Sequence, residues 1–104
     1  MLKLPPQPEH CELCLRPVAT LTRHHLIPKH LHRKKRFQKL FSKEDMITRT
    51  LWVCRPCHNA IHRARSEYEL GVYYNTRDKL MEMEELRVFV EWIRDKPSGF
   101  VPKG

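Results

Sequence analysis

The sequence has no long apolar run and no recognisable export signal. No stretch of its 104 residues is long or apolar enough to span a bilayer. Residues 1–9 contain Pro5, Pro6 and Pro8, where a secretory signal would have a basic flank followed by an apolar segment. We therefore expect a cytoplasmic protein without a membrane partner. Cysteines stay reduced in that compartment, so paired cysteines there favour metal binding over disulfides.

The chain also lacks internal repeats, low-complexity segments and the length for a second domain. A domain of about this size buries little apolar surface and usually needs a staple. We predict an irregular lead-in over residues 1–9, one domain over 10–96 and a flexible tail over 97–104. Within the domain, residues 10–66 should form the core and residues 67–96 a helical extension.

Acidic side chains are scarce in the first two thirds of the sequence. Residues 1–66 carry 14 basic and 4 acidic side chains, a net charge of +10, whereas residues 67–104 carry 6 and 8, a net charge of −2. The whole chain carries +8. Such an excess usually accompanies a polyanionic partner. We therefore expect the first two thirds to face nucleic acid.

Two CxxC pairs, Cys11-Glu-Leu-Cys14 and Cys54-Arg-Pro-Cys57, contain all four cysteines. Each pair can place two thiolates on one ion, and four thiolates complete a closed, tetrahedral, structural Zn²⁺ site. The pairs are 39 residues apart, so the insert should itself be folded. A redox-active CxxC is the alternative, but such motifs occur singly beside a βαβ pattern that is absent here.

Local patterns predict two strands and a first helix. An apolar, β-branched run predicts a strand over residues 18–27, which Pro28 should end, and a second strand fits residues 50–53. Pro56 suits the first turn of a helix that runs to about Ser66. Together these elements surround both CxxC pairs.

A longer helix is predicted near the C-terminus, from a cap at Asn75 or Thr76 to about Asp95. Apolar residues recur there every three or four positions, at Leu80, Met83, Leu86, Val90 and Ile93. This stripe should be core or docking surface, and Phe89 and Trp92 give the helix a second apolar flank, which could be core or a dimer surface. Residues 29–45 form a long basic connection, in which the apolar side chains predict an irregular helical turn or two, namely Leu31, Phe37, Leu40 and Phe41.

The histidines are grouped in a way that indicates a metal site. His58 and His62 are four apart, which places them on one face of a helix, where they can share an ion. Two solvated surface histidines would give the same pattern. His24 and His25, at the end of the first strand, strengthen the case for a metal site. Three imidazoles on one ion and a fourth free to accept a proton make a hydrolytic site. Successive residues of a regular strand point to opposite faces, so the backbone should bend there.

The remaining histidines, His10, His30 and His32, are expected to be solvated or to face phosphate. The run His-Leu-His-Arg-Lys-Lys-Arg over residues 30–36 can grip backbone phosphates, although a solvated loop or a nuclear-targeting segment is an alternative. No feature reads bases, so sequence specificity should be low. The residues expected to bind nucleic acid are Arg23, Arg33, Lys34, Lys35, Arg36 and Arg65.

The order CxxC, His-His-x-x-Pro and CxxCHxxxH over Cys11–Arg65 resembles the HNH endonucleases. That resemblance implies a small α+β fold: a ββα-metal, treble-clef-like finger stapled by a four-cysteine zinc site, plus a C-terminal helix. It also implies that His24 binds a catalytic metal, that His25 is the general base, and that His58 and His62 complete the metal site. The implied activity is metal-dependent hydrolysis of nucleic-acid phosphodiesters, with DNA preferred to RNA as the expected substrate.

Arg49 stands where the family has its central asparagine, counted back from His58. An arginine side chain has no acceptor that could hold the Nδ1 proton of a histidine base. We therefore predict that Arg49 is catalytic together with His25, but not through a side-chain acceptor. Its backbone carbonyl should accept from His25 Nδ1, and its guanidinium should face the path of the phosphates.

The ligand set also predicts the metal preference. The catalytic ion could be Mn²⁺, Ni²⁺, Co²⁺, Mg²⁺ or Zn²⁺, and three imidazoles suit Mn²⁺, Co²⁺ or Ni²⁺ better than the hard cation Mg²⁺. The alternative function is a non-catalytic zinc-binding module that grips nucleic acid. That alternative does not explain His25 beside His24, because a binding module needs no unligated base. The sequence makes no prediction of the oligomeric state.

Overall fold

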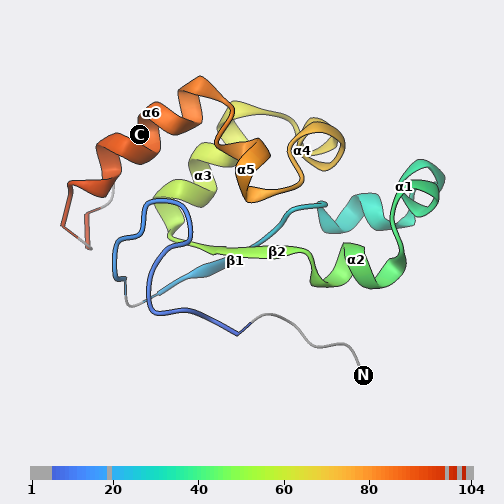
Figure 1. Ribbon diagram of the computed structural model, residues 1–104, viewed down its shortest axis with the longest axis horizontal. Coiled ribbons are helices and arrows are strands. Elements are labelled where there is room, and N and C mark those ends of the chain that lie inside the picture. Colours follow the sequence, from blue (N-terminus) through green and yellow to red (C-terminus); the bar gives the residue numbers. More distant parts are fainter. Residues whose placement is uncertain (1–5, 19, 98, 101, 103–104) are drawn as a thin grey trace.

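The structure of the protein, a computed structural model, describes residues 6–18, 20–97, 99–100 and 102. In chain order the elements are β1 (Thr22–His25), η1 (Lys29–Arg33), α1 (Lys35–Leu40), α2 (Lys43–Thr48), β2 (Thr50–Val53), α3 (Arg55–Ala64), α4 (Glu67–Tyr73), α5 (Arg77–Leu80) and α6 (Glu84–Arg94). The two strands cross the middle of the molecule, α3, α5 and α6 gather on one side of them, and α1 and α2 lie beyond one end (Figure 1). The predicted small α+β class is confirmed.

β1 and β2 form a two-stranded antiparallel sheet in which Thr22 lies opposite Val53 and His25 opposite Thr50. The predicted strand over residues 50–53 is confirmed. The first strand is shorter than the predicted range 18–27, of which residue 19 lies outside the described part. β1 stops because its partner is only four residues long, limited by α2 on one side and α3 on the other.

The insert between the strands is more helical than predicted. Most of residues 29–45 fall in η1, α1 or α2. Ile27, Leu31, Phe37 and Met46 are buried together in a small separate core, which stabilises these short helices by removing apolar surface from water. The basic run therefore belongs to a folded layer.

Helix α4 was not predicted, although its signal is present. Ser66 caps its first turn in a capping box, in which the Ser66 hydroxyl accepts from the Glu69 backbone N–H at 3.2 Å. Gly71 lets α4 approach α1 closely, because a Cβ at this position would lie 2.9 Å from Cε1 of Phe37. The contact joins the C-terminal part to the insert.

The single helix predicted from residue 75 or 76 to about 95 is wrong, because the segment forms α5 and α6. Thr76 does cap a helix, its hydroxyl accepting from the Lys79 backbone N–H at 3.1 Å. The helix stops after Leu80, and Met83 is extended, with ψ of 118°. The break lets the apolar stripe stay in the core, where Leu80, Met83, Leu86, Val90 and Ile93 are all buried.

The main core joins the cysteine loop, the sheet and α3 to the C-terminal helices. Helix α3 matches the prediction within one or two residues, with Pro56 in its first turn. Residues 6–9 are irregular as expected and residues 1–5 lie outside the described part. The carbonyl of Pro97 accepts from Arg16 at 2.6 Å, so the beginning of the predicted flexible tail, 97–104, is docked. Residues 98, 101 and 103–104 of that tail are likewise not described. Across the described ranges, no helix is long and apolar enough to cross a membrane.

Candidate metal centres and the basic cleft

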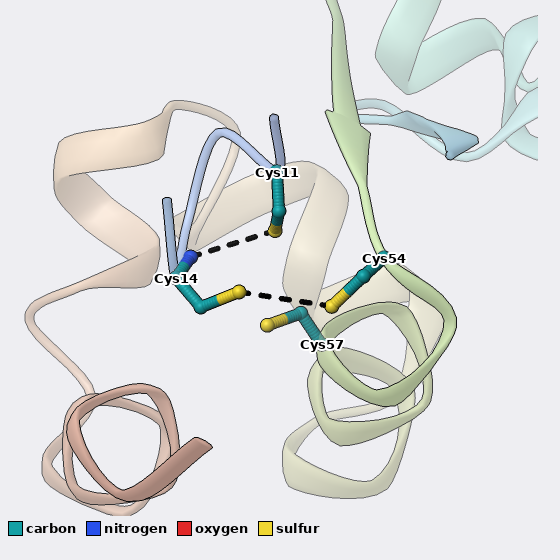
Figure 2. A group of neighbouring side chains, drawn as sticks. All are labelled: Cys11, Cys14, Cys54 and Cys57. Atoms are coloured by element: carbon teal, nitrogen blue, oxygen red, sulfur yellow. Dashed lines mark hydrogen bonds between the residues drawn. The ribbon is translucent and has the colours of Figure 1, made fainter. Parts of the chain in front are cut away.

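The four cysteines converge at one end of the sheet, as Figure 2 shows. Cys11 and Cys14 lie on the loop before β1, Cys54 follows β2, and Cys57 lies in the first turn of α3. Their Sγ atoms all lie within 4.8 Å of one another, and all four side chains are buried thiols. The cluster could hold a metal ion such as zinc, because four converging thiolates are a ligand set that zinc prefers.

The loop that carries the first cysteine pair is shaped around sulfur. The backbone N–H groups of Leu13 and Cys14 each donate to Cys11 Sγ at 3.4 Å. Leu15 then adopts a φ of 66°, in the left-handed region, and the Cys11 N–H donates to the Arg16 carbonyl at 3.0 Å. The tight turn points both sulfurs the same way.

Three histidines meet on the side of the sheet that faces α3. One nitrogen of each of His24, His58 and His62 lies within 4.8 Å of the others. The ring centroid of His24 is 5.3 Å from each of the other two, which are themselves 4.9 Å apart. The structure thus brings together the three histidines that the sequence groups as metal ligands.

His24 is the buried member of this group, with only 1% of its surface exposed. Its Nε2 has no hydrogen-bond partner among the residues that the structure describes. Burial first, and then the positive charges of the neighbouring histidines, lower the pKa of His24 to about 3. The ring is therefore neutral, and an orphaned buried nitrogen costs free energy that a bound ion would offset.

A threonine orients the second member. The Thr22 hydroxyl donates to the Val53 carbonyl at 3.0 Å and lies 2.8 Å from Nδ1 of His58. Since the hydroxyl has one proton, it must accept from His58 Nδ1, which leaves Nε2 of that ring unprotonated. Burial first, and then the charge of His62, lower the pKa of His58 to about 4. Such fixed tautomers are typical of metal-ligating histidines.

An open cleft of about 680 Å³ adjoins the three histidines. His25 lines it together with three cationic side chains, Arg23, Lys29 and Arg33. Burial lowers the pKa of His25, and the charge of Arg23 lowers it further. Strand pairing is continuous through His25, so the predicted bend is not found in β1. Both members of the His pair nevertheless line the cleft.

Sequence comparison supports a family relationship. The chain is 37% identical over 87 residues to the uncharacterized protein YisB of Bacillus subtilis (strain 168), across 84% of this chain and 75% of that protein. The chain belongs to the YisB family. No family model and no solved structure matches it. The site of this YisB-family protein is therefore interpreted from its own residues.

In this member of the YisB family, Arg49 does not have the predicted contacts. Its carbonyl accepts from the Leu26 backbone N–H at 3.0 Å, which extends the sheet by one bond. Its guanidinium lies over the Phe41 ring, 5.4 Å from the centroid, and is not part of the cleft wall. Within the described chain, no hydrogen bond joins His25 to Arg49. The sequence could not reveal that this carbonyl is already bonded to the Leu26 N–H between the two strands.

Thr50, which was not predicted, is the polar side chain directly opposite His25. The backbone of Trp52 bonds to Glu12, so Trp52 and, by alternation, Thr50 turn their backbone groups away from β1. His25 and Thr50 thus form a non-hydrogen-bonded pair, the kind in which side chains approach most closely. The Thr50 hydroxyl is buried and has no partner among the described residues.

The six residues predicted to bind nucleic acid fall in three places. Arg23 and Arg33 line the cleft, whereas Lys34, Lys35 and Arg36 are exposed outside it at the beginning of α1. Arg36 also lies over the Tyr68 ring at 5.8 Å. Arg65 is bound to Glu85 at 3.2 Å, so it is less available to a ligand than predicted.

His30 and His32, which were expected to be solvated or phosphate-facing, both line the cleft, and His30 is exposed. Each also has a protein partner. Nδ1 of His30 lies 2.6 Å from a carboxylate oxygen of Glu67. Nε2 of His32 lies 2.7 Å from the Ile27 carbonyl, and its ring centroid is 6.2 Å from that of His25. These contacts depend on how η1 folds back onto the strand, which no local pattern predicts.

Arg55 was also missed. It is exposed and lines a second hollow, of about 460 Å³, which shares His58 and His62 with the cleft. Arg55, His58 and His62 are spaced by three and four residues along α3, so the helical period could have revealed this face. The three clustered histidines therefore have cationic side chains on both sides.

Proposed function

We propose that this protein is a metal-dependent endonuclease of the HNH type that hydrolyses nucleic-acid phosphodiesters, with DNA as the expected substrate. One observation carries the proposal: the orphaned Nε2 of His24 lies in a trio of imidazoles beside an open basic cleft. A purely structural histidine cluster would satisfy that nitrogen with a hydrogen bond. The ββα-metal finger, built from β1, β2 and α3, belongs to the same proposal.

The three histidines would hold the catalytic ion. A divalent ion there supplies Lewis acidity at the scissile phosphate and at the leaving oxygen. The protein contributes orientation: the Thr22 hydroxyl holds His58 with Nε2 free, and burial keeps His24 neutral. Imidazole ligands favour Mn²⁺, Co²⁺, Ni²⁺ or Zn²⁺ over Mg²⁺.

His25 is the proposed general base. It lines the same cleft but lies on the opposite face of β1 from His24, so it stays off the ion and can take a proton from water. Its lowered pKa keeps it neutral near pH 7. Thr50, directly opposite, offers the Nδ1 proton an acceptor in place of the predicted Arg49 carbonyl.

The cysteine cluster is proposed as a structural Zn²⁺ site. Its four sulfurs are buried and leave no open position for a substrate, which is the character of structural zinc sites. The ion would join the loop before β1 to the beginning of α3, and α3 carries two of the catalytic-site histidines.

A non-catalytic nucleic-acid-binding module is the second candidate. It is favoured by one observation, that no hydrogen bond within the described chain orients the His25 ring. Such a module would use the same cationic cleft to hold phosphates and would leave His25 without a chemical role.

A nicking assay separates the two candidates. Purified protein is incubated with supercoiled plasmid and Mn²⁺, Co²⁺, Ni²⁺ or Mg²⁺, alongside His25→Ala and a panel of DNA and RNA strands. We expect nicking with transition ions and a loss of about a hundredfold or more in His25→Ala, with plasmid binding unchanged. Binding without cleavage by either protein would establish the module, and equal cleavage by both would remove His25 as the base.

A further inference from the structure

Arg16 is a buried cation beside the cysteine cluster. Only 4% of its surface is exposed. Its Nε lies 3.4 Å from Cys14 Sγ, and one terminal nitrogen lies 3.5 Å from Cys54 Sγ. The other terminal nitrogen donates to the Pro97 carbonyl at 2.6 Å. In the part of the chain that the structure describes, no carboxylate pairs with it.

A buried guanidinium needs a compensating negative charge, because desolvation disfavours an unpaired ion strongly. Neutral thiols are weak acceptors and carry no charge. Four thiolates around one divalent ion carry about two net negative charges, which matches a cation placed against them.

Arg16 contacts one sulfur from each CxxC pair. These two sulfurs, those of Cys14 and Cys54, lie 3.8 Å apart. The guanidinium therefore lies against both halves of the cysteine cluster.

We propose that Arg16 is the charge partner of the metal-bound sulfurs and couples ion binding to docking of the segment around Pro97. The contact to Pro97 spans 81 positions of the sequence. One side chain therefore joins the loop that carries Cys11 and Cys14 to the segment after α6. Arg94 makes a second link, with Nε 3.3 Å from the Cys14 carbonyl, but it does not touch sulfur. The inference rests on the proposed zinc site and is independent of nuclease activity.

The test compares Arg16→Met with Arg94→Met in the full chain. Zinc content and zinc affinity are measured by competition with a chromophoric chelator, and the thiolate-to-cobalt absorption of the Co²⁺ form reports whether four sulfurs still bind. Hydrogen exchange follows the amides of Lys96 and Phe100, which are bonded to Ile93 and Pro97. We expect Arg16→Met to keep the four-sulfur spectrum, to lose about tenfold or more in affinity, and to exchange faster at both amides.

The control should separate charge from packing. Arg94→Met removes a tether of similar size without touching sulfur, so its zinc affinity should stay within about threefold of wild type. Equal weakening in the two variants, or wild-type affinity in Arg16→Met, overturns the charge-partner role. If Arg16→Met does not fold, Arg16→Lys keeps the charge and should retain most of the affinity, and a loss as large as in a Cys11→Ser variant counts against the proposal. Folded wild-type protein that binds no zinc removes the zinc site itself.

Discussion

At the scale of single residues, two threonine hydroxyls lie beside different members of the His24–His25 pair. Thr22 lies on the same face of the sheet as His24 and bonds to His58, whereas Thr50 lies opposite His25 on the other face. In the proposed site, the Thr22 hydroxyl therefore positions a metal ligand and the Thr50 hydroxyl positions the general base. Variants that remove them singly should have different effects.

Replacing Thr22 by valine keeps the shape of the side chain and removes the oxygen that holds His58 Nδ1. Without that acceptor the ring loses its fixed tautomer and orientation, so the affinity of the three-histidine site should fall about tenfold. Titration of Co²⁺ or Mn²⁺ by calorimetry measures the effect. An affinity equal to that of wild type would show that Thr22 does not position a ligand.

Replacing Thr50 by valine should have the opposite signature. The buried hydroxyl has no partner among the described residues, so its loss removes only the acceptor that we assign to His25. We expect the cleavage rate at saturating metal and substrate to fall about tenfold, within the range for general-base catalysis, with metal affinity unchanged. A matched fall in metal affinity would instead place Thr50 in the metal site.

Thr48→Val is the control for both variants. The Thr48 hydroxyl also bonds to a carbonyl, that of Glu44 at 2.7 Å, but it lies on α2 and touches no histidine. The same substitution there should change neither metal affinity nor cleavage rate. Any change common to all three variants then measures the general cost of the substitution.

At the scale of elements, local signals predicted those parts that local physics decides. The proline in the first turn fixed the beginning of α3, and the run of residues 50–53 matched β2. The convergence of the cysteines, and that of His24 with the α3 histidines, could be inferred because ligand chemistry requires particular residue types at particular spacings.

The elements that the sequence did not reveal depend on contacts far along the chain. The apolar stripe of residues 80–93 fits one helix as well as two, and only packing against the core selects the break after Leu80. The insert reads as a basic loop because the few apolar residues that bury it are spread over η1, α1 and α2. The contacts of Arg49 and His32 follow from these placements, so they were beyond reach of local patterns.

Gly71 tests the contact between α4 and α1. Alanine usually stabilises a helix interior by up to about 1 kcal/mol relative to glycine, but here its Cβ would lie 2.9 Å from the fully buried Phe37 ring. Overpacking of this kind costs about 1–3 kcal/mol, so we expect Gly71→Ala to lower the free energy of unfolding in urea. Gly99→Ala is the control, because a Cβ there meets no atom within 4 Å. Stabilisation by Gly71→Ala would mean that α4 does not pack against α1 so closely.

At the scale of the whole molecule, the net charge differs between two parts of the chain. Residues 1–66 carry +10 and include the sheet, the insert and α3, whereas residues 67–104 carry −2 and include the helices that complete the main core. The basic run contributes to that charge mostly from outside the cleft. Cationic residues inside and outside the cleft can therefore be removed separately at equal net charge, which tests where nucleic acid binds.

Two quadruple variants remove the same charge from different places. The cleft variant changes to glutamine four cationic residues that line the two hollows beside the histidines, namely Arg23, Lys29, Arg33 and Arg55. Arg65, which also lines the second hollow, is left unchanged because it is paired with Glu85. The outer variant changes four exposed lysines of α1, α2 and their flanks, namely Lys34, Lys35, Lys39 and Lys43. The affinity for a labelled DNA duplex is measured by anisotropy over a range of salt concentrations, without added divalent metal.

The dependence of affinity on salt should flatten mainly in the cleft variant. Each phosphate contact contributes about 0.9 to the slope of log affinity against log salt concentration, so the loss of several contacts is readily measured. The outer variant has the same net charge and should keep a slope close to that of wild type, because long-range attraction alone releases few bound counterions. Equal flattening in the two variants would mean that DNA binds across the basic surface as a whole, and flattening in the outer variant alone would move the binding site to α1 and α2.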